Sequence, residues 1–263
     1  MRTPTFKMHG SKSRLAPWVV GHFPKFRRLI EPFAGRGNIF FRACGDCSFE
    51  DVLLNDLSTH PFLEALRDYS GDWAFVDEGV LDKKVWEKWK TSPPSHERAL
   101  AESYVARFGN TFSQGAALAG GDSRNRHSRK NTILRMQRGG ELLREKNAQI
   151  TGLDWAEFLL GLKLDSEDLV YLDPPYDVPQ AVHYKNIDQD HFLEVAKSLS
   201  CQVYISGYTS ERYEKALSGW GRDASIRTSS GKGSTKKGVS GGVKPLVEEV
   251  LWWNRVSPEP QKT

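Results

Sequence analysis

The stretch KFRRLIEPFAGRGNIFFRA, residues 25–43, decides the fold class of this chain. It predicts a short apolar strand that ends at Glu31, a loop of small residues from Ala34 to Gly37, and a helix that begins at Asn38. Strand, glycine loop and helix in this order are typical of α/β proteins, in which the loop brings a ligand against the backbone amides at the start of the helix. The third glycine of a dinucleotide fingerprint is missing, which argues against a nicotinamide or flavin cofactor.

A second strand that ends in an acid follows this motif. The stretch DVLLND, residues 51–56, is apolar in its middle and ends at Asp56. Asp56 lies 19 residues after Gly37, close to the offset of about 20 residues at which a carboxylate at the end of the second strand meets ribose hydroxyls. The same aspartate stands before a stretch with helical periodicity, whose first turn it would cap. The two roles are compatible, and Asp56 is predicted to bind a cofactor.

A third strand ends in a tetrapeptide that cannot continue it. In LVYLDPPYDVP, residues 169–179, four apolar residues are followed by Asp173-Pro174-Pro175-Tyr176. Because proline has no backbone N–H, the Asp173 carboxylate and the Pro174 carbonyl form a surface that only accepts hydrogen bonds. Such a surface suits an amino group with two N–H bonds, and the Tyr176 ring can stack on a planar base. The alternative is a strand that stops at a Pro-Pro turn.

The composition limits the class of protein. The 263 residues suffice for one domain with an insertion, and the formal net charge of +4 permits a nucleic-acid partner without requiring one. No run of about 18 apolar residues occurs and the N-terminal stretch lacks the apolar core of a signal peptide, which predicts a cytoplasmic protein without a membrane partner. Cys44 and Cys47 form a C-x-x-C pair without a second pair. They are interpreted as small core-facing residues, and no metal site is predicted.

Two basic stretches are candidates for contacts with phosphate groups. Residues 120–146 hold eight Arg and Lys side chains against three acids, and residues 227–244 hold four lysines, one arginine and no acid. A nucleic-acid enzyme needs positive charge near its pocket. The alternatives are a solvated face for the first stretch, whose front is predicted to be a loop, and a disordered hairpin tip for the second. The candidate nucleic-acid-binding residues are Arg124, Arg126, Arg129, Lys130, Arg135, Lys232, Lys236 and Lys237.

Taken in order along the chain, these motifs resemble those of the Dam-like, alpha-group DNA adenine-N6 methyltransferases, which use S-adenosylmethionine. The family pattern Glu-Pro-Phe-x-Gly-x-Gly matches residues 31–37. The Asn-Asp pair that closes the family's next strand matches Asn55 and Asp56, and the later Asp-Pro-Pro-Tyr motif begins at Asp173. The resemblance extends over most of the chain but is concentrated in these motifs.

Two further matches support the resemblance. Asp154-Trp155 resembles a pair in the family, an acid followed by an aromatic residue, that lies some way before Asp-Pro-Pro-Tyr. The stretch MHGSK, residues 8–12, resembles the family's N-terminal pattern of an aromatic residue, a spacer, Gly-Gly and Lys. Here Met8 replaces the aromatic residue and Ser11 replaces a glycine.

The resemblance implies S-adenosylmethionine as the cofactor and indicates which residues contact it. Lys12 would lie beside the cofactor, and Asp154 would bind its adenine. The stretch EEVLWWN, residues 248–254, resembles the family's closing strand, although its two glutamates would also protect a sheet edge from aggregation. The implied cofactor-binding residues are Met8, Lys12, Phe33, Ala34, Gly35, Gly37, Asn38, Asp56, Asp154 and Asp173.

The resemblance also implies the fold and the domain organisation. The expected architecture is α/β, a Rossmann-like methyltransferase fold with a mostly parallel seven-stranded sheet and one antiparallel strand. Residues 1–58 and 149–263 would form the catalytic domain, and residues 59–148 an inserted, mainly helical target-recognition domain. The recognised DNA sequence does not follow, because the family's usual segment for target recognition is not visible in the insertion.

The function implied is site-specific methylation of adenine N6 in duplex DNA, with the base flipped out of the helix. Asp173, Pro174 and Tyr176 are the predicted catalytic residues. The alternatives are an RNA base methyltransferase acting on adenine or guanine, and an inactive relative that only binds nucleic acid. The long insertion argues against the RNA enzyme, because compact rRNA enzymes have only short loops in this region. The expected state is a monomer or weak dimer, and the sequence leaves room for a restriction endonuclease as a partner.

Overall fold

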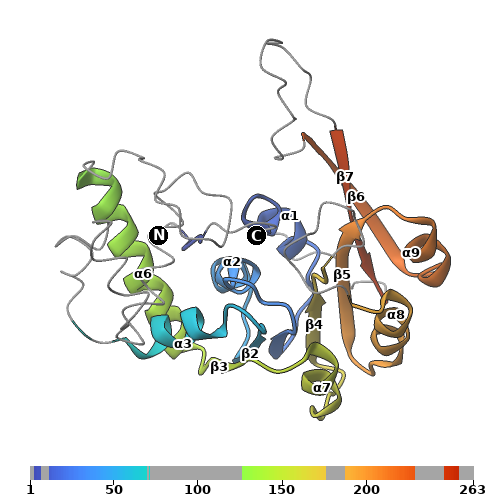
Figure 1. Ribbon diagram of the computed structural model, residues 1–263, viewed down its shortest axis with the longest axis horizontal. Helices are drawn as coiled ribbons and strands as arrows, with labels where there is room; N and C mark the ends of the chain where they lie inside the picture. Colours follow the sequence, from blue (N-terminus) through green and yellow to red (C-terminus); the bar gives the residue numbers. More distant parts are fainter. Residues whose placement is uncertain are drawn as a thin grey trace.

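The computed structural model describes residues 3–6, 12–69, 71, 126–175, 187–228 and 246–254. For residues 126–133, 227–228 and 246–247 it describes the backbone alone. The described chain contains a seven-stranded sheet with helices on both faces (Figure 1). Each described helix is too short or too polar to cross a membrane.

The strands follow the order β3-β2-β1-β4-β5-β7-β6 across the sheet. All pairs from β3 to β5 are parallel, and β7 runs antiparallel to both of its neighbours. The predicted fold class, a mostly parallel seven-stranded sheet with one antiparallel strand, is therefore confirmed. The strands are β1 (Arg28–Glu31), β2 (Asp51–Asn55), β3 (Gln149–Thr151), β4 (Asp168–Leu172), β5 (Gln202–Tyr208), β6 (Gly221–Thr228) and β7 (Leu246–Trp253).

Successive residues of the central strands face two separate hydrophobic cores. In β1, Leu29 belongs to one core and Ile30 to the other, and in β4 Tyr171 and Leu172 divide in the same way. The side chains of a strand alternate between the two faces of a sheet, so a strand covered on both faces must be apolar throughout. This requirement explains the continuous apolar runs in the sequence.

Helices from the two halves of the chain cover different faces of the sheet. The first core takes side chains from α1, α2, α3 and α6, and the second takes side chains from α7, α8 and α9. Figure 1 shows α3 and α6 at one end of the molecule and β6, β7 and α9 at the other. The helices are η1 (Lys12–Arg14, a 3-10 helix), α1 (Ala16–Val20), α2 (Asn38–Asp46), α3 (His60–Asp68), α6 (Arg126–Glu145), α7 (Trp155–Leu160), α8 (Gln189–Ser198) and α9 (Glu211–Ala216).

The glycine loop begins α2 as the sequence predicts. Gly37 has φ +70°, a left-handed conformation that side chains other than glycine rarely adopt, and the helix starts at the next residue. A Cβ atom on Gly37 would also lie 3.2 Å from the Phe41 ring. The second glycine of the motif is therefore required by the backbone itself.

Helix α6 corrects one sequence expectation. The front of residues 120–146 is predicted to be a loop; residues 120–125 lie outside the described residues, and from Arg126 onward the chain is helical instead. The second half of α6 packs on α3 and on the first core through Met136 and Leu143. A Cβ atom on Gly140 would lie 2.4 Å from the backbone oxygen of Leu66, so glycine is what allows the two helices to approach this closely.

The division into a catalytic domain and an inserted domain stays a prediction. Residues 72–125, most of the predicted insertion, lie outside the described residues. The described parts of residues 59–148, namely α3 and α6, share the core on the first face of the sheet.

Candidate active site

The strand order places a topological switch point at the carboxyl ends of β1 and β4. From β1 the chain proceeds outward to β2 and β3, then crosses back to β4 on the other side of β1. Ligands of open α/β sheets bind at such a point, where the strand order reverses. Glu31 ends β1 and Asp173 directly follows β4, so the two acids come to the same place although they are far apart in the sequence.

A buried lysine and two carboxylates form an ionic cluster at this edge of the sheet. Lys12 Nζ lies 2.9 Å from Asp173 Oδ1 and 3.4 Å from Glu249 Oε2. The exposed fractions are 6% for Lys12, 18% for Asp173 and 14% for Glu249. Burial by itself would lower the pKa of Lys12, but the negative charges of Asp173 and then Glu249 outweigh it and raise the pKa above 10.5. Lys12 is therefore an ammonium ion at neutral pH.

Two hydroxyl groups hold the Asp173 carboxylate from within the sheet. Ser206 Oγ donates a hydrogen bond of 3.0 Å to Asp173 Oδ1, and it lies 2.7 Å from the Tyr171 hydroxyl. Ser206 and Tyr171 are both buried, and burial raises the pKa of Tyr171 well above its ordinary value, as does the charge of Asp173. The tyrosine therefore remains a hydroxyl that can donate, and the chain Tyr171–Ser206–Asp173 fixes the carboxylate.

The Pro-Pro turn is anchored to α8. Gln189, which is buried at the start of that helix, donates a hydrogen bond of 3.1 Å from Nε2 to the Pro175 carbonyl. The Tyr213 hydroxyl in turn donates to Gln189 Oε1 at 2.7 Å. No donor among the described residues pairs with the Pro174 carbonyl.

Asp56 holds the glycine loop to the start of α3. Its Oδ2 accepts from Gly35 N at 2.9 Å, and its Oδ1 accepts from Ser58 N at 2.9 Å and Thr59 N at 2.8 Å. The Thr59 hydroxyl also donates to the Gly35 carbonyl. Asp56 thus closes the turn that precedes α3, but the N-cap residue of that helix is Thr59, so the predicted N-cap role of Asp56 is wrong. Its contact with a ribose stays a prediction.

Asn55, one residue earlier, joins the ends of three strands. Its side-chain Nδ2 donates to the carbonyls of Pro32 and Leu153, each at 3.0 Å, and its Oδ1 accepts from Thr151 Oγ1 and Leu153 N, each at 2.8 Å. The side chain is buried and has all four of its hydrogen bonds. It fixes the chain after β1 and after β3 relative to the end of β2.

Asp154 and Trp155 are neighbours in the sequence, but the first is exposed and the second is buried. Asp154 is exposed and caps α7, since its Oδ1 accepts from Ala156 N at 2.9 Å. Trp155 is buried, and its ring stacks on Phe33 with 5.9 Å between centroids. Phe33 follows β1, so this stacking ties the glycine-loop motif to α7 and leaves the Asp154 carboxylate beside it at the surface.

The side chain of Asn38 is engaged with the N-terminal segment. Its Oδ1 accepts from Phe6 N and its Nδ2 donates to Phe6 O, each at 2.9 Å. Asn38 was predicted to bind the cofactor. The hydrogen bonds that the structure shows for its side chain hold residues 3–6, which precede Lys12, against the start of α2.

Glu31 is a buried acid that the sequence analysis did not single out. One of its oxygens, Oε1, has no hydrogen-bond partner in the described part of the chain. Burial raises the pKa of Glu31 well above its ordinary value of 4.5; the backbone N–H of Phe40 opposes this, and the charge of Asp173 adds to it. The only signal of Glu31 in the sequence is its place at the start of Glu-Pro-Phe. Ser206 was also missed, and its only signal is that it is a polar residue within the apolar stretch of β5.

Several predicted site residues cannot be compared with the structure. Met8, Tyr176, Arg124 and the three lysines of 227–244 lie outside the described residues, and so do the side chains of Arg126, Arg129 and Lys130. Of the basic candidates, Arg135 has a described side chain, which is half-buried on α6. The other predicted residues, Ala34 and Pro174, are buried within the glycine loop and the Pro-Pro turn.

The two neighbouring cysteines behave as core residues. Cys44 and Cys47 are free thiols that pack against the first core. Burial raises the pKa of Cys44 to about 12 and that of Cys47 to about 11, so neither is a reactive thiolate at neutral pH. Among the described residues, no three His, Cys, Asp or Glu side chains gather as a group that could hold a metal.

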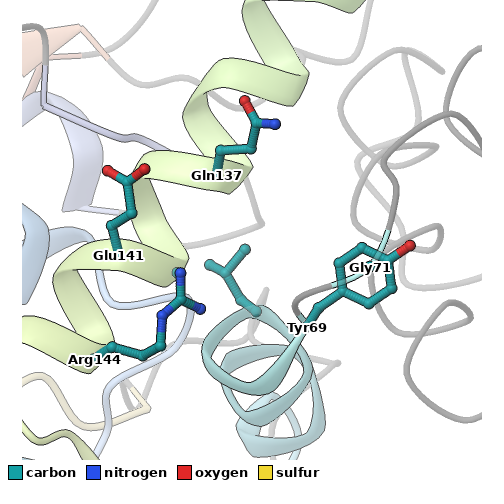
Figure 2. Close-up of a pocket in the computed structure, with 7 residues that line it drawn as sticks. Tyr69, Gly71, Gln137, Glu141 and Arg144 are labelled. Atoms are coloured by element: carbon teal, nitrogen blue, oxygen red, sulfur yellow. The ribbon is translucent and has the colours of Figure 1, made fainter.

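A separate pocket of about 450 Å³ lies between the end of α3 and the middle of α6 (Figure 2). Figure 2 shows Gln137, Glu141 and Arg144 along α6, with Tyr69 across from them. This pocket contains none of the predicted site residues. Its lining is Leu66, Tyr69, Gly71, Gln137, Gly140, Glu141 and Arg144.

Acidic side chains gather at the switch point, which suits a cofactor that carries positive charge. Asp173 lies there, and Asp56 and Asp154 stand at the ends of β2 and β3. Glu31, whose pKa is raised by burial, adds a buried oxygen without a hydrogen-bond partner among the described residues. The fold and the acids at its switch point are those expected of the class of S-adenosylmethionine-dependent methyltransferases.

The family comparison is more specific. Residues 9–66 match the model of the D12 class N6 adenine-specific DNA methyltransferases. The match contains Lys12, the glycine loop and Asp56, and it confirms over this segment the resemblance to a Dam-like adenine methyltransferase family. It also confirms S-adenosylmethionine as the cofactor. No curated protein matches the chain in a sequence comparison.

Solved structures of methyltransferases are similar to this chain at low identity. They include a putative methyltransferase, yhhF, from Escherichia coli, with 12% identity, a TM-score of 0.34, and coverage of 96% of this chain and 90% of that one. A putative methyltransferase from Streptococcus mutans in complex with SAH has 8% identity, a TM-score of 0.36 and coverage of 95% and 100%. The rRNA methyltransferase aviRa from Streptomyces viridochromogenes has 13% identity, a TM-score of 0.36 and coverage of 96% and 87%.

Proposed function

We propose that this methyltransferase acts on adenine N6 in duplex DNA and takes up the base after it has been flipped out of the helix. The observation that supports the proposal is the arrangement around Asp173. A carboxylate that Lys12 and Ser206 hold in place stands at the switch point of the sheet, directly before two prolines and beside the glycine loop. The match to the adenine-specific family model supports the same substrate. A cytoplasmic location belongs to the same proposal.

The chemistry requires a poor nucleophile to be made reactive. The lone pair of the adenine amino nitrogen is delocalised into the ring. If Asp173 and the Pro174 carbonyl each accept one N–H, they draw electron density toward the nitrogen and orient its lone pair. These hydrogen bonds strengthen as positive charge develops on the nitrogen, so they stabilise the transition state more than the ground state. S-adenosylmethionine supplies the methyl group as an electrophile: its sulfur–methyl bond breaks as the nitrogen–methyl bond forms, S-adenosylhomocysteine leaves, and the methylated nitrogen loses one proton to water.

The chain's own residues then have distinct roles in the proposal. Asp173 and Pro174 hold the amino group, and Tyr176 stacks on the flipped base. Asp56 and Asn55 keep the glycine loop and the neighbouring strand ends in place, and Asp154 presents its carboxylate at the end of β3. Holding the amino nitrogen in line with the methyl carbon removes much of the entropic barrier.

The test compares substrates and one decisive variant. The wild-type protein is expected to methylate duplex DNA, with N6-methyladenine as the product, and to leave structured RNA unmodified. Asp173→Ala is expected to lower the rate by at least about 10²–10³-fold, as the loss of an oriented electrostatic group does. Asp190→Asn, a change at an exposed acid on α8, is the control and should retain the wild-type rate.

The alternatives predict other outcomes of the same measurements. Methylation of RNA but not DNA would identify an RNA base methyltransferase. An inactive nucleic-acid-binding relative would bind DNA but give no product, and calorimetry would detect no binding of S-adenosylmethionine. Near-normal methylation by Asp173→Ala would falsify the acceptor mechanism.

A further inference from the structure

Strand β7 brings two consecutive glutamates to opposite faces of the sheet. It pairs with β5 on one side and β6 on the other, so the interpretation of these glutamates as protection of a sheet edge is wrong. Glu248 is 41% exposed and contacts Thr209 and Arg222. Glu249 points the other way and lies 3.4 Å from Lys12. Glu249 is thus the member of the pair that belongs to the ionic cluster.

The charge of the cluster matters for the proposed chemistry. Methylation of an amino group places positive charge on its nitrogen in the transition state, and a nearby negative charge stabilises it. Lys12 and Asp173 alone form a pair without net charge, and the ammonium group lies only 2.9 Å from the carboxylate that would receive the amino group. With the third member, Glu249, as a carboxylate, the cluster has one net negative charge.

We propose that Glu249 sets the charge of the site: it neutralises Lys12 and so leaves the negative charge of Asp173 to act on the substrate's amino group. This inference rests on the proposed function. Glu249 acts through Lys12 and is therefore a positioning residue, not a catalytic one. Its place on β7, next to β5 at the end of the sheet where Asp173 lies, keeps it within reach of the lysine.

The surroundings of Lys12 provide a measurement that does not depend on activity. The ionisable groups that face its ammonium group are Asp173 after β4, Glu249 on β7 and Tyr208 at the end of β5. Burial lowers the pKa of Lys12, and these three groups raise it. Removing the charge of Glu249 should therefore lower the pKa of Lys12.

The experiment compares Glu249→Gln with Glu248→Gln, two equal changes at adjacent positions of one strand. At neutral pH, Glu249→Gln is expected to lower the single-turnover rate of DNA methylation by about 10- to 100-fold, while Glu248→Gln keeps the wild-type rate. The dissociation constant for DNA should change by less than about twofold in both variants. The rate of Glu249→Gln should recover as pH rises through the lowered pKa of Lys12, because neutral Lys12 no longer compensates Asp173.

Two further measurements separate a charge effect from a loss of structure. In a Lys12→Met background, Glu249→Gln should cause no additional loss of rate, since it acts through the lysine. NMR titration of protein labelled with ¹³C-lysine, without cofactor or DNA, should show a lower pKa for Lys12 in Glu249→Gln and an unchanged pKa in Glu248→Gln. Glu249→Asp keeps the negative charge, so it should retain most of the methylation rate. It still tests the inference if Glu249→Gln does not fold.

Any one of three results overturns the inference. Folded Glu249→Gln could methylate DNA at the wild-type rate, or Glu249→Asp could show the loss of rate, about 10- to 100-fold, that is expected for Glu249→Gln. The third result is a pKa of Lys12 that is the same in Glu249→Gln and Glu248→Gln. Failure of the proposed function would look different. In that case the wild-type protein itself would transfer no methyl group to adenine in duplex DNA, while the titration of Lys12 would still respond to Glu249.

Discussion

Asp173 illustrates how a single residue acquires a chemical role from its neighbours. The sequence predicts an acceptor at this position from the two prolines that follow it. The structure adds Lys12 and Ser206, both of which bond to the same carboxylate oxygen, Oδ1. With one oxygen fixed from two directions, the orientation of the whole carboxylate is fixed as well, which is what a preorganised acceptor requires.

The orientation of Asp173 can be tested at Ser206. Ser206→Ala removes one hydrogen bond to Oδ1, a contribution of about 1 kcal/mol, and is expected to lower kcat by about 5- to 10-fold with little change in KM. Steady-state kinetics on duplex DNA would measure it. Ser198→Ala is the control, because that hydroxyl donates to a backbone carbonyl on α8 away from the site. Equal kinetics for both variants would show that Ser206 does not orient the acid.

The buried carboxyl group of Glu31 should make the stability of the protein depend on pH. Because the pKa of Glu31 is raised in the folded protein, the folded state holds this proton more tightly than the unfolded chain does. Stability is therefore lost as pH rises from the unfolded pKa through the folded pKa. Glu31→Gln is expected to raise the free energy of unfolding of the ligand-free protein at neutral pH and to have little effect below pH 4.5.

Urea denaturation across this pH range measures the effect of Glu31→Gln. Glu157→Gln, at an exposed position on α7, is the matched control and should leave the pH dependence of stability unchanged. The same pH dependence in the wild type and in Glu31→Gln would contradict the interpretation of Glu31 as a buried, destabilised acid.

At the scale of the elements, the site depends on how strand ends are joined. Neighbouring parallel strands are not joined by a tight turn, so no turn fixes the carboxyl end of one strand to that of the next. Asn55 supplies that connection, since its side chain bonds to the loops after β1 and β3 at once. The glycine loop and Asp154 are thereby held on either side of the end of β2.

Asn55→Ala is expected to lower the free energy of unfolding by about 2–4 kcal/mol, because several buried polar groups lose their partners. It should also weaken binding of S-adenosylmethionine, as measured by calorimetry. Asn254→Ala is the control: Asn254 bonds to Val203 N and Cys201 O at the opposite end of the sheet. That variant should lose stability without losing affinity for the cofactor. Equal affinity in both variants would contradict the role given to Asn55.

At the scale of the whole molecule, the elements that adjoin the two basic stretches lie at opposite edges of the sheet. Helix α6, which holds the described part of the first stretch, leads into β3 at one edge, and β6, which precedes most of the second stretch in the sequence, forms the other edge (Figure 1). The switch point between β1 and β4 lies between these two edges.

Neutralising Arg124, Arg126 and Arg129 together is expected to weaken DNA binding and to flatten its salt dependence. Every phosphate group that an arginine no longer neutralises should reduce the slope of log K against log salt by about 0.9. Fluorescence anisotropy with duplex DNA at several salt concentrations measures it. Arg138→Gln is the control, since that arginine is paired with Glu141 and Glu145 on the same helix. If the salt dependence of DNA binding is unchanged in the triple variant, residues 120–146 form a solvated face that does not contact phosphate groups.

The sequence alone determined the local motifs and, through the family resemblance, the fold class. Apolar runs buried on both faces, a glycine that must be left-handed, and a strand stopped by two prolines are consequences of nearby residues, so they can be predicted from nearby residues. The position of Asp56 before a helix was predictable for the same reason. The helix at Arg126 was missed because glycine and asparagine residues bracket this charged stretch and indicate a loop. The packing of Met136 and Leu143 on the core, which holds the helix, depends on distant parts of the chain.

Only the tertiary structure decided how the site is assembled. Lys12, Asp173, Ser206 and Glu249 come from η1, the end of β4, β5 and β7, and no periodicity relates them. They meet because the strand order places β4, β5 and β7 side by side and because β7 runs antiparallel. Pairing of strands depends on contacts between distant parts of the chain, and the charge of the site, which depends on that pairing, could not be read from the sequence.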